Sequence, residues 1–249
     1  MKTVKFLALC LAGVFGLYSC GSDDKDEKKE EQNKVYLVKN ITCTYADGDF
    51  SKTSFTYENN KITKVTETNN YNGYMSTETY SYPSANTINY SWENDESTGE
   101  GIITMNSSEN VVANIEYSSY FKEEGERLSD KGVFLYSEGH IEKFSSTDYY
   151  YNLYWSEGNL TTFKEDSDYS SNITYSDVKN NTNLDYYLWL NFEDVIFSTS
   201  QFIKNVSKNI PSSFKSEGSL STIKTTLDEK GRPSKMVYDG DTYTFEYYD

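Results

Sequence analysis

One octapeptide recurs along this chain of 249 residues, and its clearest copy reads Ser137-Glu138-Gly139-His140-Ile141-Glu142-Lys143-Phe144. Residues 156–163 and 216–223 keep the same order, Ser-Glu-Gly-x-Φ-x-x-Φ, where Φ is apolar, and looser copies occupy 58–65, 108–115 and 229–236. The third position of the six copies is always glycine or asparagine: Asn60, Asn110, Gly139, Gly158, Gly218 and Gly231. Both residue types enter the left-handed region (φ > 0) easily, so each copy predicts the bend of a β-hairpin.

The segments around these turns alternate between apolar and polar residues. Residues 88–92 read Ile-Asn-Tyr-Ser-Trp, and residues 243–247 read Tyr-Thr-Phe-Glu-Tyr. This period of two is typical of antiparallel strands with one face in water. We therefore expect an all-β fold, a large antiparallel meander of about ten to fourteen strands that is strongly curled or barrel-like. The irregular spacing of the turn units favours one closed domain over an open repeat array.

One segment, near 183–208, breaks the alternation. Residues 183–190 begin with a possible N-cap, Asn183, and continue with apolar residues at helical spacing, and Phe202, Ile203 and Val206 fit a second short helix. We expect this helical insertion to act as a lid over an open end or face of the sheet; a role in gating a ligand is the alternative.

The N-terminal residues have the features of an export signal. Residues 1–19 carry Lys2 and Lys5 before a short apolar run that ends at Cys20, which resembles the lipobox of bacterial lipoproteins. The alternative is an ordinary signal peptide with a chance cysteine. We expect a signal peptide (1–19), a lipidated Cys20 with a disordered acidic tether (20–33), and a single β domain of hairpin units (34–249).

The net charge and the cysteine content limit which binding partners and which disulfides are possible. Lys2 and Lys5 are the only charged residues of 1–19, so residues 20–249 hold 21 basic and 39 acidic residues, a net charge of −18. Nucleic acid binding needs a basic surface, so nucleic acid is not an expected partner.

Acidic residues directly after Cys20 resemble a surface-export signal of Bacteroidetes lipoproteins, which implies an outer-membrane, cell-surface location; a plain spacer is the alternative. If Cys10 leaves with the signal and Cys20 takes lipid, Cys43 alone remains and has no partner for an intrachain disulfide.

The sequence contains no recognisable catalytic set. His140 is the only histidine and stands at the variable position of a turn unit, which indicates an exposed turn residue. Asp-Gly pairs such as Asp47-Gly48 predict hairpin turns more strongly than calcium loops. We expect no enzyme activity, no metal and no cofactor. Aromatic residues give the one functional hint, because rings can stack on sugars; the candidate ligand-binding residues are Trp92, Trp155, Tyr149 and Tyr151, with core packing as the alternative.

The signal, the tether, the turn units and the segments Ile173-Thr174-Tyr175 and Ser207-Lys208-Asn209-Ile210-Pro211-Ser212 together resemble a family of uncharacterised Bacteroidetes outer-membrane lipoproteins. The resemblance implies the porin-like fold described for that family's domain of unknown function. The turn units alone also resemble the tyrosine-aspartate repeats of large bacterial surface proteins. Neither resemblance implies a catalytic residue.

Three functional hypotheses follow. The first is a lipid-anchored, non-catalytic binding module for a neutral glycan or a peptide. The second is a structural or partner-docking lipoprotein of an outer-membrane assembly, with an outer-membrane protein as its partner. The third, a carboxylate-based hydrolase, is the least favoured because acids are too abundant for any pair to be singled out. A membrane-spanning porin fits poorly, since Lys39 and Ser119 interrupt the apolar faces of two predicted strands.

Overall fold

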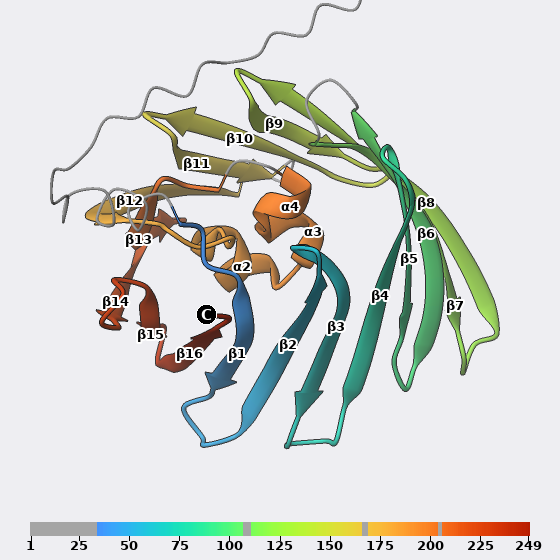
Figure 1. The fold of residues 1–249 in the computed structure, drawn as a ribbon, viewed down its shortest axis with the longest axis horizontal. Coiled ribbons are helices and arrows are strands. Elements are labelled where there is room, and N and C mark those ends of the chain that lie inside the picture. Colours follow the sequence, from blue (N-terminus) through green and yellow to red (C-terminus); the bar gives the residue numbers. More distant parts are fainter. Residues whose placement is uncertain (1–33, 107–110, 166–168, 204–205) are drawn as a thin grey trace, which may run out of the picture. The chain divides into compact units, whose positions relative to one another are not determined.

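The computed structural model describes residues 34–106, 111–165, 169–203 and 206–249, of which residues 35–249 form one compact unit. In this unit sixteen antiparallel strands close into a barrel (Figure 1). Each strand pairs with its neighbours in sequence, and β1 closes the barrel by pairing with β16. The all-β, barrel-like prediction is confirmed.

The strands are β1 (Val38–Thr44), β2 (Phe50–Glu58), β3 (Lys61–Asn69), β4 (Met75–Ser84), β5 (Thr87–Glu93), β6 (Ser97–Asn106), β7 (Val111–Phe121), β8 (Glu126–Ser137), β9 (His140–Ser145), β10 (Tyr150–Ser156), β11 (Asn159–Glu165), β12 (Ser170–Lys179), β13 (Asn209–Ser216), β14 (Ser219–Leu227), β15 (Pro233–Tyr238) and β16 (Asp241–Tyr247). The predicted count of ten to fourteen strands was too low. Several hairpins turn without the octapeptide, as at Ala85-Asn86 between β4 and β5, so counting turn units missed them.

The described octapeptide turns, apart from the longer loop at Gly231, are two-residue hairpin loops in which both central residues are left-handed. Between β8 and β9, Glu138 has φ 52° and Gly139 has φ 83°, and the loops at Gly158 and Gly218 repeat this arrangement. Asn60 and Gly231 also have positive φ, whereas Asn110 lies outside the described residues. Two successive positive φ values define a type I′ turn, whose twist matches that of the flanking strands. The glutamate at the first left-handed position was not predicted.

Replacing Gly218 by valine is expected to lower the free energy of unfolding by about 1–2 kcal/mol, because a β-branched residue is strained at positive φ. Gly218 has φ +86°, and a Cβ atom there would meet nothing within 4 Å, so backbone strain alone is tested. The matched change Glu217→Asn, at φ 49°, should be neutral or stabilising, since asparagine tolerates this conformation. Equal losses in both variants, measured by denaturant unfolding, would argue against the turn type.

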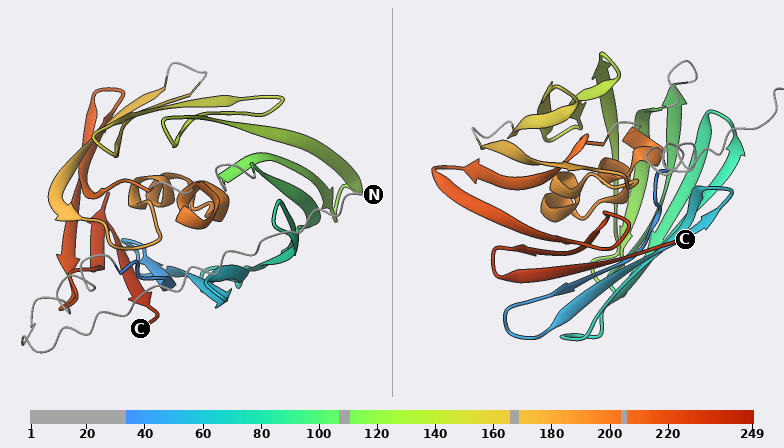
Figure 2. Two further views of the ribbon diagram at one scale, coloured as in Figure 1. Left: turned by 45° about the horizontal axis from the view of Figure 1, so that its top comes forward. Right: turned by 60° about the vertical axis from the view of Figure 1, so that its left-hand side comes forward.

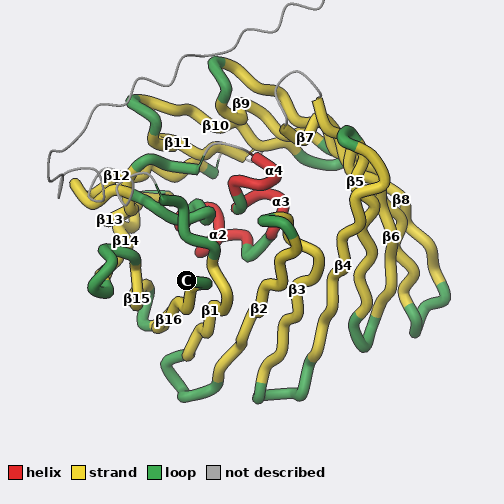
Figure 3. Tube along the Cα trace, in the orientation of Figure 1, coloured by secondary structure: helices red, strands yellow, loops and turns green. Residues whose placement is uncertain are grey.

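The long connection between β12 and β13 forms three short helices, α2 (Tyr186–Phe192), α3 (Val195–Ser198) and α4 (Ser200–Ile203). The helical insertion is confirmed, and the helices lie inside the ring of strands, where they cover the inner face of the sheet (Figures 2 and 3). We call α2, α3 and α4 the plug. It lies inside because its residues are apolar on nearly all sides: Tyr186 to Leu190 are all buried.

Rings from many strands surround the plug. Trp189 packs against Phe55 of β2, Tyr186 against Phe245 of β16, and Tyr187 against Phe214 of β13, with ring centroids 5.2–5.6 Å apart. Phe197 contacts Phe134 of β8 and Phe144 of β9 on the opposite side of the barrel. The core is therefore the space between the wall and the plug.

The predicted N-cap of the first helix was wrong by two residues. Asp185 caps α2, and its side chain accepts a hydrogen bond from the Leu188 amide. Asn183 instead ties the insertion to the wall, because its Oδ1 accepts from Val38 N at 2.9 Å and its Nδ2 donates to the Tyr57 hydroxyl at 3.0 Å.

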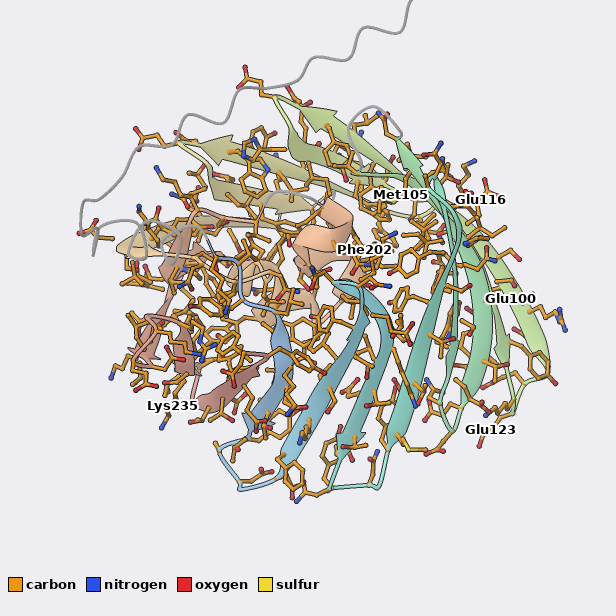
Figure 4. The ribbon with its side chains drawn as sticks, viewed as in Figure 1. Glu100, Met105, Glu116, Glu123, Phe202 and Lys235 are labelled. Atoms are coloured by element: carbon orange, nitrogen blue, oxygen red, sulfur yellow. The ribbon has the colours of Figure 1, made fainter. Side chains whose placement is uncertain are left out.

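The two faces of the wall differ in character. One inward row crosses five strands as Tyr80, Tyr90, Gly101, Tyr117 and Asp130. The adjacent outward row, listed across the same strands, is Thr79, Ser91, Glu100, Ser118 and Ser129. In Figure 4 Phe202 lies inside the barrel, whereas Glu100, Glu116 and Lys235 lie along its outer side. Rings thus fill the interior, and polar side chains predominate on the outside of these strands, with exposed apolar exceptions such as Ile102 and Tyr120.

None of the helices in the described part of the chain has the length and apolar character needed to cross a membrane.

Candidate functional site: a pocket in the barrel interior

An interior pocket of about 270 Å³ lies between the plug and one side of the wall. Its lining combines aromatic, aliphatic and acidic side chains: Glu78, Tyr80, Tyr90, Trp92, Ile115, Tyr117, Phe134, Phe144, Tyr149, Asp194, Val195, Ile196 and Phe197. Tyr149 belongs to the β9–β10 loop and is exposed, so the pocket communicates with that end of the barrel. We call this space the lumen pocket.

Two strand glycines shape its floor. A Cβ atom at Gly99 would lie 1.9 Å from the Trp92 ring, and one at Gly101 would lie 2.3 Å from the Tyr90 ring. Without those atoms, both rings lie directly against the β6 backbone. Tyr80, Tyr90 and Trp92 are nearly parallel, with interplanar angles of 17° and 19° between neighbours. They form a continuous aromatic surface across β4, β5 and β6.

Replacing Gly101 by alanine is expected to lower the free energy of unfolding by about 1–3 kcal/mol through overpacking. The new Cβ would also meet the backbone oxygen of Glu116 at 2.6 Å, which a side-chain rotation cannot relieve. Glu100→Ala, on the outward face of the same strand, is the control and should change stability little. A loss no larger than that of the control, in chemical denaturation, would show that the glycine is not needed.

Two carboxyl groups enter this aromatic pocket from different parts of the chain. Glu78 comes from the inward face of β4, and Asp194 precedes α3, where its Oδ1 accepts hydrogen bonds from the Ile196 and Phe197 amides at 2.7 and 2.9 Å. Asp194 keeps an exposed surface although it lies on the insertion inside the barrel, so the lumen pocket is open to water. The loss of hydration inside the barrel nevertheless raises the pKa of Asp194, and these two amides oppose the change.

Burial raises the pKa of Glu78 to about 7. The Tyr80 hydroxyl donates a hydrogen bond to its Oε2 and opposes this effect, whereas the negative charges of Asp194 and Glu67 add to it. Neither Glu78 nor Asp194 forms an ion pair with a lysine or arginine of the described ranges. Above pH 7 the pocket therefore holds negative charge without a basic partner, in an aromatic surrounding.

This pKa predicts a pH-dependent stability. A folded-state pKa of about 7, above the ordinary value of 4.5, means that the native state binds more protons than the unfolded state between these values. The free energy of unfolding then falls as pH rises through this range. Glu78→Gln should be more stable than the parent protein by about 1–3 kcal/mol at pH 8, with the difference vanishing near pH 4.

Urea unfolding of both proteins at pH 4.5, 6 and 8 measures this difference. The control Glu100→Gln removes an exposed acid of the outer face and should show no such trend. A constant difference between Glu78→Gln and the parent at all three pH values would contradict the prediction.

The structure separates the four aromatic residues that the sequence singled out. Trp92 and Tyr149 line the lumen pocket. Tyr151 packs against Tyr149 but does not line the pocket; its ring also packs against that of Phe163 in β11. Trp155 lies elsewhere, where its Nε1 donates to the Ile141 carbonyl at 2.7 Å and its ring lies 4.7 Å from that of half-buried His140. Cys20 lies outside the described residues.

Sequence reasoning missed Glu78, Tyr117 and Asp194. Glu78 carried a usable signal, because it shares the inward face of β4 with Tyr80 and Tyr82, where an acid is unexpected. Asp194 looked like one of many acids, and its position depends on how the plug folds. Cys43, the free cysteine of the described residues, is buried, and burial raises the pKa of its thiol to about 11.

A larger hollow, of about 980 Å³, lies on the outer face of β4 to β8. Short polar side chains such as Thr79, Ser91 and Ser118 contribute much of its lining. It lacks tryptophan and an enclosed carboxyl group, so the lumen pocket is the better candidate site. Within the described ranges, no three His, Cys, Asp or Glu side chains gather as metal ligands.

The sequence matches no protein-family model and no curated protein. The fold is similar to the crystal structure of a porin-like protein from Bacteroides uniformis, with a TM-score of 0.65 and 11% identity over 85% of this chain and 98% of that one. A porin-like protein from Bacteroides vulgatus aligns over 86% of this chain and 99% of its own, with a TM-score of 0.42 and 12% identity. The first similarity shows that this chain has a porin-like barrel fold.

Proposed function

We propose that this chain is a non-catalytic binding protein, held at the outer membrane and cell surface by lipid on Cys20, that takes its ligand into the lumen pocket. The observation that carries the proposal is the pocket itself, where an aromatic surface and two carboxyl groups meet in a space open to water. Concave, largely apolar sites with a few polar groups are the usual form of small-ligand sites. The ligand classes are a neutral glycan or a peptide.

The volume of the pocket limits what enters it. A cavity of about 150 Å³ accommodates benzene, so 270 Å³ has room for about ten non-hydrogen atoms. One sugar ring or one side chain therefore fills the pocket, and the rest of a larger ligand stays outside. Affinity should be weak, about millimolar to micromolar, because so small a contact supplies only a few kcal/mol after the entropy of association.

The residues on the outside of the barrel favour attachment to the membrane through the lipid on Cys20 over attachment through membrane-spanning strands. A membrane-spanning barrel carries an apolar band on its outward face. Here the outward row across β4 to β8 consists of Thr79, Ser91, Glu100, Ser118 and Ser129. Closure by β1 and β16 leaves no free strand edge within the described barrel, which weakens docking through edge pairing.

Tryptophan fluorescence of the full-length chain in detergent, titrated with neutral glycans and short peptides, tests ligand binding. Trp92→Phe should abolish the response, whereas Trp155→Phe, outside the pocket, should retain it. If no ligand alters the fluorescence while an outer-membrane protein co-purifies with the chain, partner docking replaces binding as the function.

Cell fractionation tests the anchor. The Cys20→Ala variant should be absent from the membrane fraction or should retain its signal peptide, since diacylation requires the thiol. Unchanged sedimentation of the processed variant with outer membranes would overturn lipid anchoring.

A further inference from the structure

We infer that the group which enters the lumen pocket is an organic cation, of the kind carried by a lysine or arginine side chain of a peptide. This inference rests on the proposed binding function and specifies the chemistry of its ligand. It follows from three features of the pocket: its unpaired carboxyl groups, its aromatic lining and its size.

The carboxyl groups lack a counter-charge from the protein itself. Glu78 and Asp194 both line the pocket, and lysine and arginine are absent from its described lining. Glu67 and Glu193, whose pKa values are also raised by burial, add negative charge nearby in the lumen. Enclosed charges usually have a partner, because their loss of hydration is unfavourable. A ligand cation would supply the partner that the chain does not.

The aromatic lining favours the same ligand. Tyr80, Tyr90 and Trp92 lie side by side on one wall, and Tyr117 stands at 68° to Trp92 with ring centroids 6.1 Å apart. The faces of such rings attract cations, tryptophan most strongly. A neutral sugar would also stack on these rings and donate hydrogen bonds from its hydroxyl groups to the carboxyl groups, but above pH 7 it would leave the ionised groups without a counter-charge.

The volume of the pocket favours a single cationic side chain over a larger cationic ligand. The pocket has room for about ten non-hydrogen atoms. A lysine or arginine side chain fits within that limit together with its methylene stem, which contacts the rings. Anionic groups are opposed by the same carboxylates and by the net charge of −16 of the whole chain.

The test compares two probes that differ only in the charged group. Nα-acetyl-lysine-amide and Nα-acetyl-norleucine-amide share a backbone and a four-carbon side-chain stem, but only the first carries a side-chain ammonium group. Both are titrated into the full-length chain in detergent by calorimetry and tryptophan fluorescence, beside a panel of neutral monosaccharides. We expect the lysine probe to bind at least 10-fold more tightly than the norleucine probe.

Matched variants assign that preference to the pocket. Glu78→Gln with Asp194→Asn removes the two carboxyl groups that line the pocket and leaves Glu67 and Glu193 in place, and asparagine retains the ability to cap α3. Glu100→Gln with Glu116→Gln removes the same charge from the outer face. The first pair should abolish the 10-fold preference, and the second pair should retain it. Should the first pair fail to fold, Glu78→Gln alone and the two-probe comparison on the parent protein remain decisive.

Each outcome has a distinct meaning. Equal binding of the two probes, tighter binding of a neutral sugar, or a preference that survives loss of the Glu78 and Asp194 carboxyl groups would overturn the cation inference and leave the binding function standing. Absence of binding by both probes and by every neutral compound would overturn both.

Discussion

Replacing Phe202 by alanine is expected to lower the free energy of unfolding by about 3–5 kcal/mol. The side chain is 0% exposed, lies inside the barrel and packs on Tyr80 with ring centroids 5.5 Å apart. Removing the ring leaves a cavity that the closed wall cannot collapse to fill. The affected pair connects α4 to the strand that carries Glu78, so the variant should also weaken ligand binding in the lumen pocket.

Chemical denaturation of the purified chain measures this loss. Phe50→Ala is the matched control, because that ring is 39% exposed at the start of β2 and its removal should cost far less. A loss below about 1 kcal/mol for Phe202→Ala would contradict the position of the plug inside the barrel, since burial of the ring is what the value reports.

Replacing Asp185 by alanine is expected to lower the free energy of unfolding by about 2–4 kcal/mol. Its carboxyl group is 0% exposed, Oδ2 accepts from Ser207 N at 2.7 Å and Oδ1 accepts from Leu188 N at 3.1 Å. Truncation leaves two amides without these acceptors, and an unsatisfied buried donor costs about 1–3 kcal/mol. Asp185 thus joins the start of the plug to the chain that follows it.

Asp194→Ala is the matched control for this residue. Asp194 also caps a helix and also accepts from two amides, but this residue keeps exposed surface in the open lumen pocket, whereas Asp185 is fully buried. Its loss should cost about 1 kcal/mol, as for an ordinary N-cap, because water replaces the acceptor. Equal losses for the two variants, measured by the same denaturation, would show that burial of Asp185 does not matter.

The candidate site was only partly predictable. Trp92 and Trp155 each stand one residue before the end of a strand, β5 and β10, and yet only Trp92 lines the pocket. The difference arises from their neighbours: Gly99 provides space for the Trp92 ring, whereas the Ile141 carbonyl binds the Trp155 nitrogen. Which residue opposes which depends on register, and register is not readable from one strand alone.

The helical insertion was also predictable only in part: two of its helices could be predicted from the sequence, but their position could not. Apolar residues at helical spacing predicted α2 and the part of α4 that holds Phe202 and Ile203, because this period reflects one face of a helix, but α3 was not predicted and Val206 lies outside a helix. The same residues did not say that the helices lie inside the barrel. That position depends on how much interior space remains after the wall closes, and closure brings together Asn40 and Glu246, which are 206 residues apart and hydrogen-bonded at 2.7 Å.

The sequence by itself determined the local features of this protein: the tight turns at glycine and asparagine, the alternating strands and the all-β class. These follow from backbone preferences and side-chain periods that act over a few residues. The tertiary structure alone decided that sixteen strands close into a barrel, that the apolar insertion fills it, and that Glu78 meets Asp194 beside Trp92. Those outcomes depend on strand register and tilt summed around the whole barrel, which no single segment encodes.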